Sequence, residues 1–171
     1  MRVLVVSQYF WPETFRINDV VLDLTQRGHD VTVLTGLPNY PDGVVFPEYR
    51  ADPKRFAQFA GAGIVRVPVF PRGRGSWRLM LNYATFVLTG CLLGPWLLRE
   101  REFDIIFIFQ LSPVTSAIPG LVVSRFRKLP VMMWVLDLWP DTLAALGVVR
   151  TPWVLDLIGR MVGAIYRRCN L

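Results

Sequence analysis

The chain has 171 residues, 53% of them hydrophobic, which is enough for one well-buried domain and too few for two of ordinary size. Nineteen Lys and Arg against 13 Asp and Glu give a formal charge of +6, which indicates an anionic partner such as a membrane surface, phosphate groups or nucleic acid. Eleven Phe, six Trp and scattered basic residues without a nucleic-acid-binding motif favour lipid, so no nucleic-acid partner is expected.

The first 34 residues have the pattern of a strand, a helix and a second strand. Val3–Val6 is a short apolar run, typical of a strand buried on both faces of a parallel sheet. The helix that follows has apolar residues at i, i+3, i+4 and i+7 from Ile17 and ends at Gly28. His29 then leads into the second strand, Val31–Leu34, at the edge of the sheet away from the expected site, so we predict a structural role for this histidine.

A long loop is expected over Thr35–Gly63, with a strand resuming at Ile64–Val69. Leu79–Leu98 then runs for 20 residues without a charge. Such a helix could span a bilayer, pack on the sheet while leaving apolar surface for the membrane interface, or be buried. The basic residues before it either meet anionic lipid or a polyprenyl pyrophosphate, or form a solvated surface; they are Arg66, Arg72, Arg74 and Arg78.

The second half continues the alternation of strands and helices. Strands are predicted at Ile105–Phe109 and Val131–Leu136, and helices begin at the pairs Ser112–Pro113 and Thr151–Pro152, which have the pattern of a cap followed by proline. The fold class is therefore α/β, a doubly wound Rossmann-like parallel sheet with one long apolar helix. No G-x-G-x-x-G or P-loop follows the first strand, which disfavours a dehydrogenase half-domain, and we expect no bound cofactor.

Two features indicate a cytoplasmic protein. Cys91 and Cys169 lie far apart without metal-type spacing, as expected in a reducing compartment, so we predict no metal site and no catalytic cysteine. Residues 1–10 lack the length and the small-residue cleavage site of a signal peptide. We therefore expect the chain to remain where it is made.

The strand that ends near Leu136 leads directly into polar residues. Asp137, Trp139 and Asp141 follow it, and ligands of open α/β sheets lie beyond the carboxyl ends of the strands. Both carboxylates are thus candidate site residues, the alternative being that they cap a short helix.

Two further groups follow the first and second strands. The first group lies at a helix start that favours an anion, although its acids could simply satisfy the helix dipole; it comprises Glu13, Arg16, Asn18 and Asp19. The second group is Asn39 and Tyr40, which lie between Pro38 and Pro41. We expect them either to contact a sugar face or to form a rigid turn without ligand contact.

Three segments of this sequence resemble the N-terminal domain of family 4 glycosyltransferases of the GT-B type. They are S-Q-Y-F-W-P-E through R-I-N-D in Ser7–Asp19, R-G-H-D-V-T-V-L-T through P-N-Y-P in Arg27–Pro41, and D-L-W-P-D at Asp137–Asp141. The likeness is greatest to enzymes that build bacterial capsule, O-antigen and colanic-acid-like exopolysaccharides. It extends over nearly the whole chain and agrees with the order of elements predicted above.

The resemblance implies transfer of a sugar from a nucleotide-sugar donor to a lipid-linked or glycan acceptor, at the cytoplasmic face of the plasma membrane. Residues 1–171 would form one acceptor-side domain, with the donor-binding C-terminal domain absent or supplied separately. Asp137 would be the base or orienting group and Asp141 the second candidate, with Trp139 binding substrate. Relatives often carry histidine or arginine where this chain has Leu136. The resemblance also implies retention of anomeric configuration, which requires no enzyme nucleophile.

Two other functions compete with that expectation. One is a non-catalytic, membrane-associated subunit that recruits a separate donor-binding subunit. The other is a flavodoxin-like or receiver-like binding module, which needs an acidic cluster or a phosphate loop at the end of the first strand. Glu13 alone offers little of either.

Overall fold

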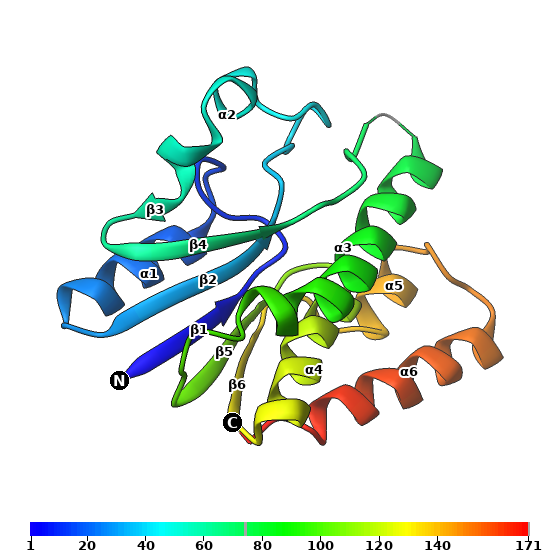
Figure 1. Ribbon diagram of the computed structural model, residues 1–171. Coiled ribbons are helices and arrows are strands. Elements are labelled where there is room, and N and C mark those ends of the chain that lie inside the picture. Colours follow the sequence, from blue (N-terminus) through cyan, green and yellow to red (C-terminus); the bar gives the residue numbers. More distant parts are fainter. Residues whose placement is uncertain (74, 171) are drawn as a thin grey trace.

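The computed structural model describes residues 1–73 and 75–170 and contains a six-stranded sheet in the order β3-β4-β2-β1-β5-β6. Neighbouring strands are parallel except for the short antiparallel pair β3 and β4. The strands are β1 (Arg2–Val6), β2 (Asp30–Gly36), β3 (Gln58–Phe59), β4 (Ala62–Val67), β5 (Ile105–Gln110) and β6 (Val131–Val135). The predicted α/β class and mostly parallel sheet are confirmed (Figure 1).

Helices cover both faces of this sheet. The α-helices are α1 (Arg16–Gln26), α2 (Pro47–Ala51), α3 (Ser76–Leu97), α4 (Ile118–Arg127), α5 (Asp141–Ala145) and α6 (Pro152–Tyr166), and the 3-10 turns are η1 (Pro53–Phe56) and η2 (Val114–Ala117). Figure 1 shows α3, α4 and α6 together on one side of the sheet. On the other side, α1 packs through Ile17 and Val21.

The alternation of side chains along β1 divides the core into two layers. Val3 and Val5 belong to the cluster that includes α1, whereas Leu4 and Val6 belong to the cluster that includes α3, α4 and α6. Both layers are apolar because successive residues of a strand point to opposite faces and both faces are covered. This is why the central strands read as continuous apolar runs instead of alternating ones.

The prediction of a long loop over Thr35–Gly63 is wrong in part, because this segment contains α2, η1 and β3. Aromatic contacts distant in sequence hold these short elements, including Trp11 with Phe56 at 4.9 Å between ring centroids. The next strand also lies earlier than predicted, at Ala62–Val67, because Pro68 has no N–H to donate to the ladder.

The helix predicted to begin at Ser112–Pro113 begins later. Pro113 has extended backbone angles and only precedes the 3-10 turn η2, and α4 itself starts at Ile118. The start at Thr151–Pro152 is confirmed, with Pro152 the first residue of α6. Gly28, predicted to end the first helix, has a positive φ of 80° just after it.

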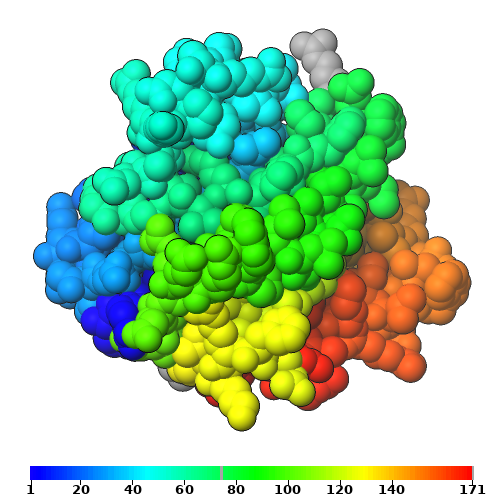
Figure 2. Space-filling model, in the orientation of Figure 1, coloured from blue at the N-terminus to red at the C-terminus, as the bar shows by residue number. Residues whose placement is uncertain are grey.

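The long apolar helix is α3, which is long and apolar enough by composition to cross a bilayer but packs against β2, β4 and α4. Its buried face consists of Asn82, Phe86, Gly90 and Gly94. A Cβ at Gly90 would lie 2.7 Å from Pro119 Cγ, so this glycine permits the close approach of α3 to α4. The opposite face of α3 is exposed (Figure 2).

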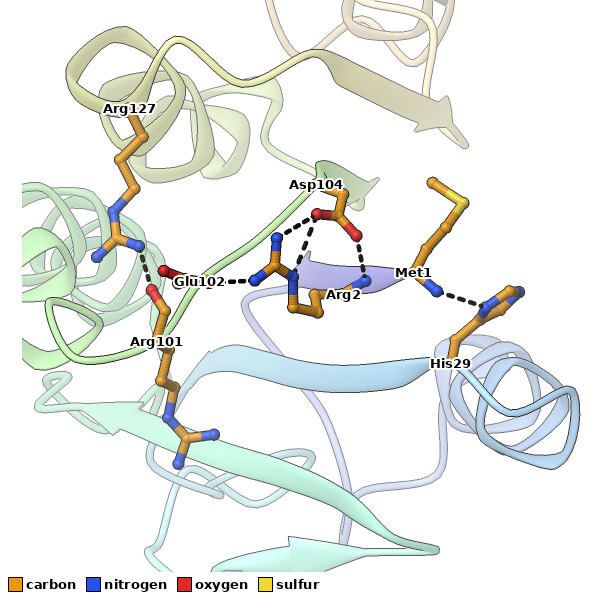
Figure 3. A network of polar contacts seen from close by, with 7 residues as sticks. All are labelled: Met1, Arg2, His29, Arg101, Glu102, Asp104 and Arg127. Carbon is orange, nitrogen blue, oxygen red and sulfur yellow. Dashed lines mark hydrogen bonds and ion pairs between the residues drawn. The ribbon is translucent and has the colours of Figure 1, made fainter.

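A polar network joins the N-terminal ends of the strands, away from the predicted site (Figure 3). Arg2 donates to Asp104 at 2.7 Å and also pairs with Glu102. His29 Nδ1 lies 3.4 Å from the N-terminal amine of Met1. The histidine therefore sits at the edge where a structural role was predicted, beside the N-terminal amine.

Candidate functional site

The C-terminal ends of the parallel strands meet along one edge of the sheet. Strand order reverses at β1, which has β2 on one side and β5 on the other. In open α/β sheets the crevice beyond such a reversal is where ligands bind. The segments that follow the parallel strands at this edge begin at Ser7, Leu37, Pro68, Leu111 and Leu136. All nine site residues predicted from the sequence lie in three of these segments or in the first turns of the helices that follow them.

Glu13 fastens the loop after β2 to the loop after β1. Its Oε1 accepts the backbone N–H groups of Asn39 and Tyr40, both at 2.7 Å, and its Oε2 accepts the N–H of Phe10 at 3.2 Å. The side chain is only 3% exposed. The structure therefore brings Glu13, Asn39 and Tyr40 together, with the carboxylate directed at backbone amides.

Burial raises the pKa of Glu13 to about 7, although the three backbone hydrogen bonds and the charge of Arg66 act in the opposite direction. Arg66 is itself partly buried, and burial lowers its pKa. Its guanidinium donates to the carbonyl of Gly36 at 2.9 Å and to that of Trp11. Arg66 thus cross-links the ends of the strands and does not reach the lipid or solvated surface expected for it.

Asn82 of α3 connects the helix to the same two loops. Its Oδ1 accepts from Gln8 Nε2 at 2.8 Å and from the hydroxyl of Tyr9 at 2.7 Å. Its Nδ2 donates to the carbonyl of Phe70 at 2.7 Å and lies 3.4 Å from Asn39 Oδ1. Because Asn82 is fully buried, these bonds fix the rotation of α3 about its axis.

An aromatic cluster with one guanidinium lies beside this network. The ring of Tyr9 stacks on Phe15 at 5.4 Å, and Tyr40 contacts both rings. The guanidinium of Arg72 lies 5.1 Å from the centre of the Tyr40 ring. Arg72 is also held through its backbone N–H, which donates to Asn39 Oδ1 at 2.9 Å.

Tyr83 is close enough to both Arg72 and Asp137 for their charges to affect its pKa. Burial raises the pKa of Tyr83, the charge of Arg72 opposes the shift, and the charge of Asp137 adds to it. Arg72 and Asp137 therefore both act on the phenol of Tyr83. A cation, a carboxylate and aromatic faces thus gather at the strand ends, which is suited to holding an anionic group and a hydroxyl group of one substrate.

Asp137 is half-buried and held in place by its neighbours. Trp139 Nε1 donates to its Oδ2 at 2.9 Å. Burial alone would raise the pKa of Asp137, but hydrogen bonds from the side chains of Thr142 and Trp139 outweigh it, and Ser112 adds a third. The pKa is thereby lowered, so this side chain is a carboxylate at neutral pH. Helix α5 begins after Pro140 without a side-chain cap, so the alternative that Asp137 or Asp141 caps this helix is wrong.

The remaining predicted residues lie at helix starts. Asp141 is exposed as the first residue of α5, and Arg16 and Asp19 are exposed in the first turn of α1. Asn18 Nδ2 donates to the carbonyl of Glu13 at 2.7 Å, which stabilises the turn between β1 and α1. Arg74, one of the basic residues expected near lipid, lies outside the described residues.

Four side chains of the site were not predicted as site residues: Gln8, Tyr9, Asn82 and Tyr83. The one local signal for them is that Asn82 and Tyr83 are polar groups within an otherwise apolar helix. Within residues 1–73 and 75–170, no group of three or more His, Cys, Asp or Glu side chains is arranged to hold a metal ion.

The doubly wound sheet with its polar strand ends defines this protein as a Rossmann-like α/β domain. The chain belongs to the glycosyl transferase 4-like domain family, which it matches over residues 14–168. Among proteins with curated descriptions, none matches the chain.

Two solved glycosyltransferases share the fold. The glycotransferase of kitacinnamycin superposes with a TM-score of 0.55 at 17% identity, covering 98% of this chain and 38% of its own. CalG4, the calicheamicin glycosyltransferase, superposes with a TM-score of 0.54 at 16% identity, covering 93% of this chain and 42% of its own. The chain thus spans about two fifths of the length of either enzyme, and the likeness establishes the fold.

Proposed function

We propose that this chain is the acceptor-binding, membrane-docking half of a glycosyltransferase in cell-surface polysaccharide synthesis. Its enzyme would move a hexosyl group from a nucleotide-sugar donor to a lipid-linked or glycan acceptor, with retention of configuration. The observation that carries the proposal is the held carboxylate of Asp137 at the strand ends, acting with Arg72 on Tyr83. The donor would bind to a second domain facing this edge.

Asp137 would orient the acceptor hydroxyl and stabilise the positive charge that develops on the transferred sugar. Retention needs no nucleophile from this half, so the carboxylate acts through its charge and position. Its lowered pKa suits that role because the group stays ionised throughout the cycle. Asp141, Arg16 and Asp19 would contact substrate only through exposed side chains at the rim.

Arg72 would hold a phosphate of the acceptor or donor. It is half-buried over Tyr40 and carries no carboxylate partner among the described residues, so its charge is free to bind an anion. Tyr40 and Trp139 offer the aromatic faces that suit carbohydrate rings. In this scheme Glu13 contributes indirectly, by fixing the loop that carries Asn39 and Tyr40.

The outer face of α3 would dock on the cytoplasmic side of the plasma membrane. Met80 and Leu92 are 69% and 67% exposed on this helix. At its two ends, Arg78 and Arg99 stack over exposed tryptophans, Trp77 at 5.1 Å and Trp96 at 4.5 Å. Tryptophan and arginine at the ends of an exposed apolar helix are typical of segments that lie in a lipid interface.

The alternative of a non-catalytic subunit that recruits a separate donor-binding subunit has one specific observation in its favour. Large apolar side chains are exposed on α6 and on the segments before and after α5, near Asp137 in sequence. They are Leu138, Leu146, Val148, Trp153 and Leu157. A patch of this kind marks a protein interface. It would be covered by a donor-binding domain of the same enzyme or by a separate donor-binding subunit.

Mutation of Asp137 in the enzyme that contains this chain tests the proposal. With a nucleotide-sugar donor panel and extracted membrane lipids as acceptors, Asp137→Asn should lower kcat at least about 100-fold and leave donor KM unchanged. Asp156→Asn, which breaks an exposed ion pair on α6, should stay within about twofold. Undiminished turnover by Asp137→Asn would remove the carboxylate from the mechanism. Absence of transfer by the parent enzyme with every donor would favour the recruiting subunit.

A further inference from the structure

A second apolar site lies between α4 and α6, away from the strand ends. The two helices leave a groove of about 480 Å³ between them. Its apolar lining includes Ile118, Leu121, Val122, Phe126, Met161 and Ile165. Phe126 is 74% exposed at the end of α4, which leaves the groove open there. The volume falls within the range of about 300–1,000 Å³ that is usual for small-molecule sites.

The groove ends in a smaller recess that is lined by two arginines. This recess has a volume of about 170 Å³ and shares Leu121, Arg125 and Arg168 with the groove. Neither guanidinium makes a hydrogen bond or ion pair within the part of the chain that the structure describes. Ser124 also lines the recess, where its hydroxyl donates to the carbonyl of Leu129 at 2.7 Å.

An apolar groove that leads to a paired cationic end is complementary to an anionic amphiphile. The chain of such a molecule gains by leaving water for the groove, at about 0.8 kcal/mol for each buried CH₂. Its phosphate would lie between Arg125 and Arg168, where charge-assisted hydrogen bonds are strong and bidentate geometry is available. A neutral or purely apolar occupant would leave both arginines without partners.

The position of the groove identifies the source of that amphiphile. Pro119 of α4 packs on Gly90 of α3, and α6 lies on the far side of α4. Figure 2 shows α3, α4 and α6 side by side on one face of the molecule. A bilayer that meets the outer face of α3 would therefore lie against the mouth of the groove.

We propose that the groove between α4 and α6 binds one acyl chain of an anionic membrane phospholipid, with its phosphate held by Arg125 and Arg168. The choice of a bilayer lipid rests on the proposed docking of α3. The site itself is separate from Asp137 and from sugar transfer. It would add a saturable, headgroup-selective contact to the non-specific insertion of α3.

Photo-cross-linking from vesicles tests this assignment. The full protein is mixed with vesicles of phosphatidylethanolamine that contain phosphatidylglycerol with a diazirine in one acyl chain, and labelled peptides are mapped by mass spectrometry. Label should appear on residues 118–126 and 161–168 as well as on α3. A phosphatidylcholine probe with the same chain should label the groove at least tenfold less. Label confined to residues 76–97, or equal label from both probes, would overturn the proposal.

Two matched pairs of variants separate the groove from the docking helix. Ala164→Phe adds bulk at an exposed position in the groove and should reduce groove labelling at least tenfold, while vesicle flotation is retained. Ala51→Phe, at an exposed position at the end of α2, should leave groove labelling unchanged. The double change Arg125→Gln with Arg168→Gln should abolish the preference for phosphatidylglycerol. Arg50→Gln with Arg55→Gln, at exposed positions near η1, should preserve it.

Failure of the docking proposal gives a different result from failure of this one. If the protein does not float with vesicles, soluble dihexanoyl phosphatidylglycerol is titrated by calorimetry. Saturable binding that Ala164→Phe abolishes would support the groove without the docking helix, and no binding would overturn it. A change in sedimentation of Ala164→Phe with unaltered labelling would instead make the groove an interface between copies and overturn the proposal.

Discussion

Glu13 Oε1 and the backbone N–H of Asn39, 26 positions apart in the chain, are joined by a hydrogen bond of 2.7 Å. This bond ties the loop after β1 to the loop after β2, at the edge where the strand order reverses. The loop that presents Tyr40 and supports Arg72 is thus held by a buried carboxylate as well as by hydrogen bonds within its own turn. The integrity of the site therefore depends on a side chain that does not face it.

Removal of the Glu13 carboxylate should destabilise the fold. Glu13→Ala leaves three buried backbone N–H groups without acceptors, and each costs about 1–3 kcal/mol. We expect a loss of at least about 3 kcal/mol in the free energy of unfolding, measured by urea denaturation. Glu48→Ala, at an exposed position in α2, should change it by less than about 0.5 kcal/mol. Equal effects of the two changes would contradict the role assigned to Glu13.

The stability of the protein should fall as the pH rises from about 4.5 to about 7 through the titration of Glu13. Its pKa is 4.5 as a free side chain and about 7 in the fold, so the folded state binds the proton more tightly. The contribution is fully present below the unfolded pKa and lost above the folded one, and it amounts to about 3 kcal/mol. Glu13→Gln should remove this component of the pH profile. Parallel profiles for the two proteins between pH 5 and pH 8 would show that Glu13 titrates normally.

The indole of Trp139 should control the ionisation of Asp137. Trp139→Phe removes the donor at 2.9 Å but retains an aromatic ring against the neighbouring core cluster. Because that hydrogen bond favours the charged form, its loss should raise the pKa of Asp137 toward its ordinary value. Carboxyl ¹³C chemical shifts followed through a pH titration give the pKa directly. The unsubstituted protein is titrated alongside, and the same pKa of Asp137 in both proteins would contradict the role given to the indole.

The parts of the fold that sequence predicts are those that local pattern determines. Val3–Val6 and Ile105–Phe109 are recognisable because a strand buried on both faces must be apolar throughout. Helices α1 and α6 likewise show their ends through Gly28 and Pro152. The small elements between β2 and β4 have no such pattern, since contacts such as Trp11 with Phe56 become available only after the strands have assembled.

The site, like the fold, was predicted only where local sequence pattern determines the position of a residue. The position of Asp137, Asn39 and Glu13 after strands follows from the sheet alone. That Glu13 is buried and directed at Asn39 and Tyr40 could not be predicted, because its partners come from another loop. Asn82 is a polar residue within an apolar helix, and its role emerges only from the packing of α3 on the sheet.

Asn82 should contribute more to stability than an exposed asparagine that also forms a hydrogen bond to the backbone. Asn82→Ala removes the acceptor for Gln8 and Tyr9 and the donor to the carbonyl of Phe70 in a buried site. We expect a loss of at least about 2 kcal/mol in the free energy of unfolding. Asn170→Ala, which removes one exposed acceptor for the N–H of Val131, should cost no more than about 1 kcal/mol. If Asn82→Ala were the milder change, the network around α3 would not be stabilising.

Gly43 should be required for the contact between the loop after β2 and the segment before α3. It has a φ of 70°, and a Cβ there would lie 1.9 Å from the backbone nitrogen of Gly73. Because neither backbone segment can yield as a side chain would, Gly43→Ala should destabilise the protein by more than about 2 kcal/mol and expose residues 37–45 to limited proteolysis. Gly61 has a similar φ of 88° with open space around it, so Gly61→Ala should cost only about 1 kcal/mol and leave the cleavage pattern unchanged. The comparison isolates the collision from the backbone strain that both substitutions share, and equal losses would mean that the two segments do not touch in solution.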